Sequence, residues 1–242
     1  MSQEIEENVF FGFHNVRATL QEKEVTKLYV QKGMKKDDII GLARAKGVPV
    51  TFVDKYKLDK MTGNATHQGF VAEAAPVDYK TVKDIIARGS QKKNPMVLIF
   101  DEVTDVNNLG AILRISDGFG ISGVVIGKKR SAQLNASVAK SSTGAINYVD
   151  VARVTNIRHA INDLKNAGYF VAYLDMDGEQ KVQDVKFDIP IAVVVGGEDK
   201  GITPSIKKYC DFGITIDMYG TVNSLNVSSA TSILAHNYAI KQ

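Results

Sequence analysis

Short apolar runs alternate with helical patterns in the first third of the chain. Val25–Val30, Val48–Val53 and Gly69–Ala72 are rich in β-branched, aromatic and small apolar residues and predict β-strands. Between the first two runs, Asp37–Lys46 has apolar residues at helical spacing, and Gly47 follows as a residue that commonly ends helices. This alternation predicts a small α/β domain.

The rest of the chain carries longer and more continuous apolar runs. Runs without polar alternation are typical of parallel strands that helices cover on both faces. Helical patterns at Ala160–Lys165 and Ser228–Ile240 supply such helices. We therefore expect an α/β fold with an open, mostly parallel sheet, whose ligands bind at the carboxyl ends of the strands. The expected strands are Met96–Phe100, Gly123–Gly127, Tyr169–Leu174 and Ile191–Val195.

The charge of the chain is informative only through its distribution. The 242 residues include 30 basic and 27 acidic side chains, and a net charge of +3 does not by itself indicate nucleic-acid binding. Residues 76–95 hold five basic and two acidic side chains and contain the structure-breaking stretch RGSQKKNP. We expect a basic linker at 76–95 between a domain of residues 1–75 and a domain of residues 96–242. A solubilising tether and a hinge that touches phosphates both fit this segment.

Several classes of protein are excluded by what the sequence lacks. Cys210 is the single cysteine, so an internal disulfide and a cysteine-based zinc site are not expected, and we expect no metal. The N-terminus has no basic segment followed by an apolar one, as a signal peptide would. The apolar stretch Ile189–Val195 contains Pro190 and is far shorter than the ~20 residues of a membrane span. We expect a cytoplasmic protein without membrane contact.

A glycine pattern that resembles a dinucleotide-binding motif occurs in the wrong context. Gly118, Gly120 and Gly123 match GxGxxG, a motif that binds pyrophosphate when it follows a strand and opens a helix. Here a helical pattern, Leu109–Ile115, precedes the glycines and a strand follows them. We interpret the match as a helix-to-strand turn.

Three other loops follow apolar strands and carry candidate chemistry, the third of them after the expected strand Gly213–Ile216. Their glycines allow a ligand to approach the backbone, and their Asn, Ser and Glu side chains offer fixed donors and acceptors. One such loop alone is commonly an ordinary turn with a helix cap, but three loops at strand ends of one sheet favour a binding site. The candidate residues are Asn108 and Arg114 in the first loop, Gly196, Gly197, Glu198 and Gly201 in the second, and Ser224, Leu225 and Asn226 in the third.

These three loops carry a family resemblance. N-x-G-A-x-x-R at 108–114, G-G-E-x-x-G-I at 196–202 and S-L-N-V-S at 224–228 resemble, in order and separation, the signature motifs of the SpoU (TrmH-type) RNA ribose methyltransferases of the SPOUT superfamily. The likeness covers residues 96–242. The first region, from FGFHNV to HQGFVA, is similar to the small ribosomal-protein-like RNA-binding domain of bacterial 23S rRNA guanosine-2′-O-methyltransferases.

The resemblance implies a fold, a cofactor and roles for particular residues. It implies a deep trefoil knot in the C-terminal domain, although true knots are otherwise essentially absent from proteins. It implies a homodimer that binds S-adenosylmethionine and methylates a ribose of RNA, most directly rRNA. Asp217 of this chain stands where the family usually has a proline, and the loss of the proline makes the third loop less rigid. By position, the cofactor would be contacted by Gly196, Ile216 and Leu225, with Gly197, Gly201 and Met218 nearby. Arg114 would lie at the ribose, and Asn108 would orient it. The pocket would be completed by Glu198, Ser224 and Asn226.

Other functions stay open at this point. The same motifs serve tRNA guanosine methyltransferases and rRNA adenosine resistance methylases. A non-catalytic RNA-binding module of ribosome assembly would keep the fold without the reaction, although Asn108, Arg114 and Glu198 are all present. A nicotinamide-dependent oxidoreductase would need the misplaced glycine motif to be functional.

Overall fold

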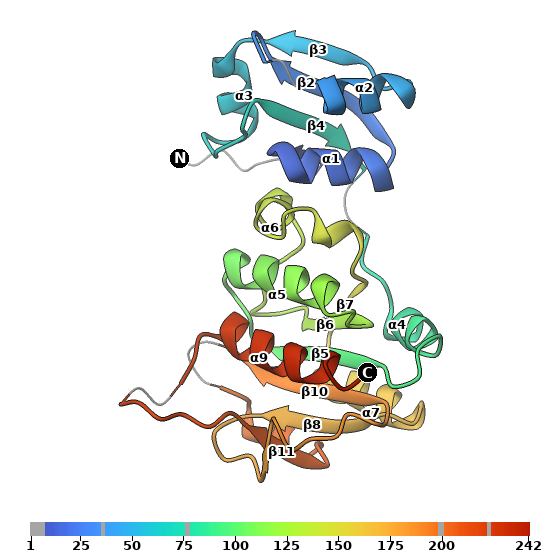
Figure 1. The fold of residues 1–242 in the computed structure, drawn as a ribbon, viewed down its shortest axis with the longest axis vertical. Coiled ribbons are helices and arrows are strands. Elements are labelled where there is room, and N and C mark those ends of the chain that lie inside the picture. Colours follow the sequence, from blue (N-terminus) through green and yellow to red (C-terminus); the bar gives the residue numbers. More distant parts are fainter. Residues whose placement is uncertain (1–7, 35–36, 76–77, 198–200, 222–223) are drawn as a thin grey trace. The chain divides into compact units, whose positions relative to one another are not determined.

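The chain divides into two units, each with its own β-sheet (Figure 1). A computed structural model describes residues 8–34, 37–75, 78–197, 201–221 and 224–242. Unit 1 comprises Met1–Asp78 and Gln133–Tyr148, and unit 2 comprises Tyr79–Ala132 and Val149–Gln242. One segment inside the second half of the chain therefore belongs structurally with the first.

Unit 1 is built on a four-stranded sheet. Its elements are β1 (Val9–Phe11), α1 (Phe13–Glu22), β2 (Val25–Gln31), α2 (Asp37–Ala45), β3 (Val50–Val53), α3 (Lys55–Met61) and β4 (Phe70–Ala74). The strand order is β1-β4-β2-β3, with β4 antiparallel to both neighbours and β2 parallel to β3. The three strands and the helix predicted here are confirmed, with ends that differ by one or two residues.

The first strand and the first helix were not predicted. The strand β1 has only three residues, which is too short for a visible alternation. The helix α1 buries Asn15 and Thr19 beside Val16 and Leu20, so its inward face is not marked by apolar spacing. Thr19 tolerates burial because its hydroxyl donates a hydrogen bond of 2.8 Å to the carbonyl of Asn15, one turn earlier.

The segment 133–148 completes the core of unit 1. It contains α6 (Ala136–Ser141) and a short 3-10 helix, η1 (Ala145–Asn147). Ala136 is buried in a cluster with Phe11 and Leu58, among others. Gly144 has φ +94°, and a Cβ at this position would lie 2.5 Å from the Cβ of Ala18. Only glycine fits this approach, because both the backbone angle and the contact exclude a side chain.

Unit 2 contains a seven-stranded sheet in which all pairs are parallel. Its strands are β5 (Met96–Asp101), β6 (Gly123–Gly127), β7 (Val151–Val154), β8 (Phe170–Leu174), β9 (Gln180–Lys181), β10 (Ile191–Gly196) and β11 (Phe212–Thr215). The order is β7-β6-β5-β10-β8-β11-β9. The predicted open parallel sheet and its continuous apolar strands are confirmed, and β5 is buried along its whole length. The trefoil knot stays a prediction with which this strand order is consistent.

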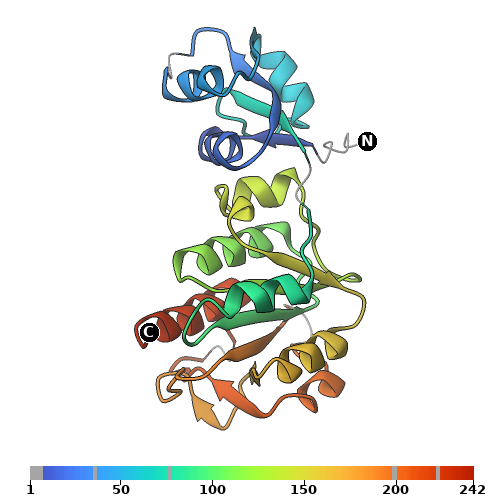
Figure 2. The ribbon, with the colours of Figure 1, turned by 90° about the vertical axis from the view of Figure 1, so that its right-hand side faces the viewer.

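Helices cover both faces of this sheet (Figure 2). They are α4 (Val82–Gly89), α5 (Val106–Gly118), α7 (Ile157–Asn166), α8 (Pro204–Lys207) and α9 (Val227–Ala239). Val97 and Ile99 of β5 pack with residues of α4, α7 and α8 in one core cluster. The helices α5 and α9 pack against each other on the opposite face. The helical patterns at 160–165 and 228–240 are confirmed. No helix within the described ranges is both long and apolar enough to cross a bilayer.

Part of the segment expected as a linker is helical and belongs to unit 2. Thr81 caps α4 by accepting the backbone N–H of Asp84, and the carboxylate of Asp84 accepts the N–H of Thr81 in return. Ile85 is fully buried against Gly123 of β6. The sequence signal was weak because the apolar residues of α4 lie among charged ones. Ser90–Lys93 are exposed, as expected.

The GxGxxG string is a helix-to-strand turn, as predicted. The helix α5 ends at Gly118, Gly120 has φ +67°, and Gly123 begins β6. This string therefore does not open a helix.

Candidate functional site

The three candidate loops lie at the carboxyl ends of neighbouring strands. The strands β5, β10, β8 and β11 are adjacent in the sheet, in that order. The first loop leads from β5 into α5, the second follows β10, and the third leads from β11 into α9. Because parallel strands end at the same edge of the sheet, residues more than 100 positions apart meet there.

A cavity of about 400 Å³ opens at this edge. Seven of the eight residues predicted to bind the cofactor line it, and Asn226 is the exception. Its other lining residues come mainly from the ends of β8, β10 and β11 and from the start of α9. The lining residues are Leu174, Asp175, Met176, Val195, Gly196, Gly197, Gly201, Ile202, Thr215, Ile216, Met218, Ser224, Leu225, Val227 and Ala230.

Close backbone packing explains the glycines of the second loop. A Cβ on Gly196 would lie 2.3 Å from the carbonyl carbon of Gly201, and one on Gly197 would lie 2.2 Å from the carbonyl oxygen of Glu102. Gly197 and Gly201 also form an antiparallel bridge, and Gly201 has φ +62°. Side chains at these positions would push the backbone apart, so the wall of the cavity is made of backbone here.

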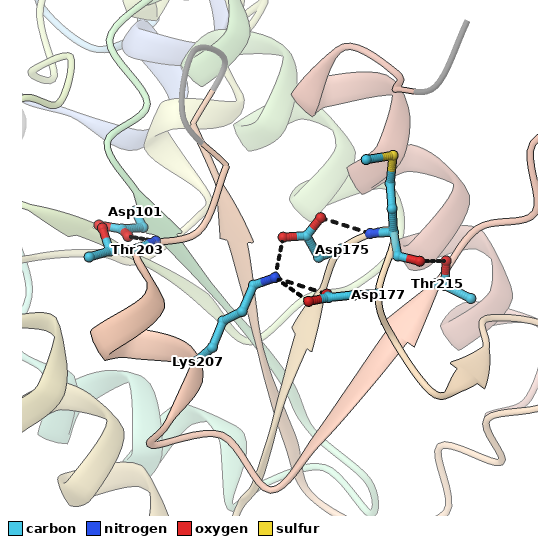
Figure 3. Close-up of polar contacts among 7 residues, drawn as sticks. Asp101, Asp175, Asp177, Thr203, Lys207 and Thr215 are labelled. Atoms are coloured by element: carbon cyan, nitrogen blue, oxygen red, sulfur yellow. Dashed lines mark hydrogen bonds and ion pairs between the residues drawn. The ribbon is translucent and has the colours of Figure 1, made fainter. Parts of the chain in front are cut away.

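Buried Asp101 anchors the segment that follows the second loop. Asp101 is the last residue of β5, and its Oδ2 accepts a hydrogen bond of 2.9 Å from the backbone N–H of Thr203 (Figure 3). A carboxylate that is 6% exposed needs such a partner. The contact holds the chain between β10 and α8 against β5.

Asn226 connects the third loop to the first. Its Oδ1 accepts the backbone N–H of Ser228 at 2.9 Å and thereby caps α9. Its Nδ2 donates to Oδ1 of Asn108 at 3.1 Å. Asn108 lies in the first turn of α5, whose N-cap Asp105 accepts the N–H of Asn107 at 2.6 Å. Both asparagines are therefore fixed at helix starts beside the cavity.

Asn108 and Arg114, two of the three proposed catalytic residues, are not among the described residues that line the cavity. Arg114 lies farther along α5 and is exposed, and its guanidinium makes no hydrogen bond or ion pair with another side chain or carbonyl of the described ranges. Asn108 is half-buried. Glu198 lies outside the described residues. The structure thus brings Asn108 to the third loop and leaves the guanidinium of Arg114 open to solvent.

The loop after β8 was missed by sequence reasoning. Leu174, Asp175 and Met176 line the cavity beside the second and third loops. The available signal was their place directly after an apolar strand, the same signal that marks the other loops. Lys207 Nζ lies 2.7 Å from Oδ2 of Asp175 and 2.8 Å from Oδ1 of Asp177 (Figure 3). Burial lowers the pKa of Lys207, but the two carboxylates outweigh burial and raise this pKa above its usual value.

The described residues of the site form no cluster for a metal ion. Within the ranges that can be described, no three His, Cys, Asp or Glu side chains gather closely enough to hold one. Among the described residues, the cavity wall combines apolar side chains, glycine backbone and one charged side chain, that of Asp175. This combination suits an organic ligand with an apolar ring and a few hydrogen-bond donors.

Known proteins match both parts of the chain. Residues 95–236 match the SpoU rRNA Methylase family, and residues 9–80 match the RNA 2′-O ribose methyltransferase substrate binding family. A protein of Staphylococcus haemolyticus with the provisional name TrmH family tRNA/rRNA methyltransferase is 40% identical over 96% of this chain and 95% of its own length. A protein of Staphylococcus aureus with the same provisional name is 38% identical over the same shares.

Solved structures share the fold. The SpoU methyltransferase AviRb of Streptomyces viridochromogenes, in complex with AdoMet, superposes with a TM-score of 0.79 at 19% identity and covers 96% of this chain and 89% of its own. An AdoMet-bound rRNA methyltransferase of Sinorhizobium meliloti has a TM-score of 0.80 at 20% identity, covering 96% and 87%. A TrmH family protein of Porphyromonas gingivalis has 0.75 at 25% identity, covering 98% and 91%.

Proposed function

The chain belongs to the SpoU rRNA methylase family, and we propose that it transfers a methyl group from S-adenosylmethionine to a ribose 2′-oxygen of RNA, with a guanosine of 23S rRNA as the target. The observation that carries the proposal is the cavity at the ends of β8, β10 and β11. Seven residues that the family resemblance assigns to the cofactor line this cavity, and they come from two loops that are separate in sequence.

The residues of this cavity fit S-adenosylmethionine. The volume of about 400 Å³ lies in the range of small-molecule sites. Leu174, Val195, Ile216 and Leu225 offer apolar surface for the adenine ring. The glycine backbone of the second loop allows polar groups of the cofactor to approach main-chain donors and acceptors. We propose that Gly196, Ile216 and Leu225 contact the cofactor, with Gly197, Gly201, Met218 and Ser224 around them and Asn226 behind the third loop.

Arg114 is proposed to position the RNA and to stabilise developing negative charge. When bound, S-adenosylmethionine supplies a methyl group activated by its sulfonium centre. The attacking 2′-oxygen must lose its proton and align with that methyl group. A guanidinium with a pKa above about 12 is a poor base, but its planar fork can bind a phosphate and stabilise an alkoxide. The exposure of Arg114 leaves it accessible to such a substrate.

Asn108 and Glu198 complete the proposed catalytic set. The hydrogen bond from Asn226 fixes the carboxamide of Asn108 at the start of α5, so that this carboxamide can orient the ribose or Arg114. Glu198 has this role from the family resemblance alone.

The N-terminal region is proposed to select the RNA. Its match at residues 9–80 to a substrate-binding family supports a division of labour between this region and the cofactor cavity of unit 2. RNA is generally recognised through its shape, exposed loops and backbone. We propose a cytoplasmic homodimer, since two copies would present two such domains and two basic segments to one RNA.

The choice between rRNA and tRNA is the finer part of the proposal. The names of the staphylococcal relatives include both substrates. The test incubates the purified chain with radiolabelled S-adenosylmethionine and either unmodified 23S rRNA or unmodified tRNA, and maps alkali-resistant linkages. Label in one guanosine of rRNA would support the proposal, and label confined to tRNA would replace the substrate. Absence of transfer to either RNA would favour a non-catalytic binding role.

A further inference from the structure

We propose that Asp175 accepts a hydrogen bond from a ribose hydroxyl of the cofactor's adenosine, and that Lys207 holds its carboxylate in place for this purpose. The proposal rests on the function proposed above, in which the cavity binds S-adenosylmethionine. Asp175 follows the last residue of β8, between the strands that lead into the second and third loops. Nothing in the three signature motifs includes it.

The position of Asp175 in the wall makes it the natural polar contact for a ligand. Among the described residues that line the cavity, it is the only one with a charged side chain. Its Oδ2 lies 3.8 Å from the point where a Cβ of Gly201 would be, so the carboxylate borders the second loop. Because Gly201 carries no side chain, the space on this side of the carboxylate stays open to a ligand.

Two donors fix the orientation of the carboxylate. The backbone N–H of Met176 donates to Oδ1 at 2.7 Å, and the ammonium of Lys207 lies 2.7 Å from Oδ2 (Figure 3). An ionised carboxylate has about four acceptor positions, so these two bonds leave others for a ligand. The side chain of Asp175 is 26% exposed and that of Lys207 is 23% exposed, so the pair is accessible without being freely solvated.

The ion pair with Lys207 affects which hydrogen-bond donors of a ligand can bind to Asp175. Lys207 offsets part of the negative charge of Asp175, but it also pairs with Asp177, so its one positive charge is shared between two carboxylates. An uncharged donor gains a charge-assisted hydrogen bond without needing a free negative charge. In an adenosine ligand the ribose diol supplies such donors, whereas the adenine ring suits the apolar side chains of the wall.

Asp177 provides a matched control for the same ion-pair network. It binds the same ammonium, with Nζ of Lys207 2.8 Å from Oδ1 and 2.9 Å from Oδ2. Its side chain is 64% exposed and it does not line the cavity. A substitution at Asp177 therefore changes the electrostatics of Lys207 without removing an acceptor from the site.

The experiment measures binding of S-adenosylhomocysteine to the full chain by calorimetry, with analogues that lack the 2′- or the 3′-hydroxyl of its adenosine. For the wild type, we expect one of these analogues to bind about ten-fold more weakly or worse. Asp175→Ala should weaken binding of S-adenosylhomocysteine by a similar factor. This variant should bind S-adenosylhomocysteine and that deoxy analogue with similar affinity. Asp177→Asn should bind S-adenosylhomocysteine with an affinity within about two-fold of the wild type, because loss of an exposed ion pair has a small effect.

Lys207 is tested as a positioning residue. Lys207→Met should reduce both the affinity and the discrimination between hydroxyl and deoxy analogues, and Lys207→Arg should restore most of each. Thermal unfolding of each variant separates these effects from loss of fold.

Distinct outcomes would overturn the proposal. Unchanged affinity in Asp175→Ala, or equal discrimination against the deoxy analogues in the wild type and Asp175→Ala, would refute the assigned hydroxyl contact. The assigned contact would also be refuted if Asp175→Ala changed the discrimination against an analogue without the adenine amino group and left the discrimination against the deoxy analogues unchanged. If the wild type itself did not bind S-adenosylhomocysteine, the proposed function would fail and this inference with it.

Discussion

Asn226 and Asn108 are 118 positions apart in the sequence, and their side chains share a hydrogen bond of 3.1 Å. Through the same side chain Asn226 also caps α9, by accepting the N–H of Ser228. One asparagine thus stabilises the last helix and joins the third loop to α5, the helix that carries Asn108 and Arg114. These two roles can be separated by substitution.

We expect Asn226→Ala to lose both roles and Asn226→Asp to lose one. Removal of an N-cap acceptor costs about 1 kcal/mol of unfolding free energy, whereas Asp remains a good cap. Asn226→Asp cannot donate to Asn108, so methylation should fall although stability in urea is retained. Urea unfolding and turnover with labelled cofactor check the two effects. Equal activity of Asn226→Asp and the wild type would show that the bond to Asn108 is not needed.

Arg114→Lys tests positioning by the guanidinium fork. The substitution keeps the positive charge but loses the planar pair of donors, so kcat should fall by about ten-fold or more. Affinity for S-adenosylhomocysteine should not change, because Arg114 does not line the cavity. Arg158→Lys, at an exposed position on α7, serves as the control. Turnover of Arg114→Lys near that of the control would contradict the role.

Gly196→Ala tests the backbone contact in the second loop. Its Cβ would meet the carbonyl carbon of Gly201 at 2.3 Å, and relief of such overpacking costs about 1–3 kcal/mol. We expect lower stability and loss of S-adenosylhomocysteine binding. Gly118→Ala is the control, because no atom lies within 4 Å of its Cβ and the residue ends a helix. A defect in Gly118→Ala would instead give the GxGxxG string a function.

The packing of segment 133–148 in unit 1 can be measured with two glycine substitutions. Gly144→Ala places a residue at φ +94° and a Cβ 2.5 Å from the Cβ of Ala18. Gly168→Ala introduces a similar angle, φ +88°, with no atom within 4 Å. Both should lose about 1–2 kcal/mol of unfolding free energy from the angle, and Gly144→Ala should lose about 1–3 kcal/mol more from the contact. Equal losses in urea unfolding would mean that Ala18 does not pack there.

Cys210 should react slowly with thiol reagents. Burial raises the pKa of its thiol to about 11, so about 0.1% is thiolate at pH 8. The rate of alkylation by iodoacetamide should rise with pH up to about 11, since the thiolate is the nucleophile. The urea-unfolded chain is the control and should react much faster at pH 8. Similar rates for the folded and unfolded chains would contradict the burial of this thiol.

Much of unit 2 was predictable because its signals are local. The apolar runs at β5, β6, β8 and β10 are continuous, since these strands are buried on both faces. The first two loops were found because each follows such a run, and the third because it follows the shorter apolar stretch Gly213–Ile216. The misplaced GxGxxG string was correctly read as a turn from the order of the elements around it.

Other features depend on partners that are distant in sequence. The helix α4 was taken as part of a linker because its few apolar residues become significant only when Ile85 packs against Gly123. Segment 133–148 shows no sign in its own residues that it completes the core around Phe11. Asp175 was missed because an aspartate after a strand is common, and only the tertiary structure shows its ion pair with Lys207 and its place in the cavity wall.

By itself, the sequence determined the type and place of most of the described strands and of several helices, the three signature loops and the family to which the chain belongs. These follow from burial patterns and from residue types at fixed spacing, which are properties of short segments. The tertiary structure decided which loops share one cavity, which glycines are required by contact, and that Asp175 faces the proposed cofactor site. These depend on the order of parallel strands in the sheet, because that order brings together residues that no local pattern connects.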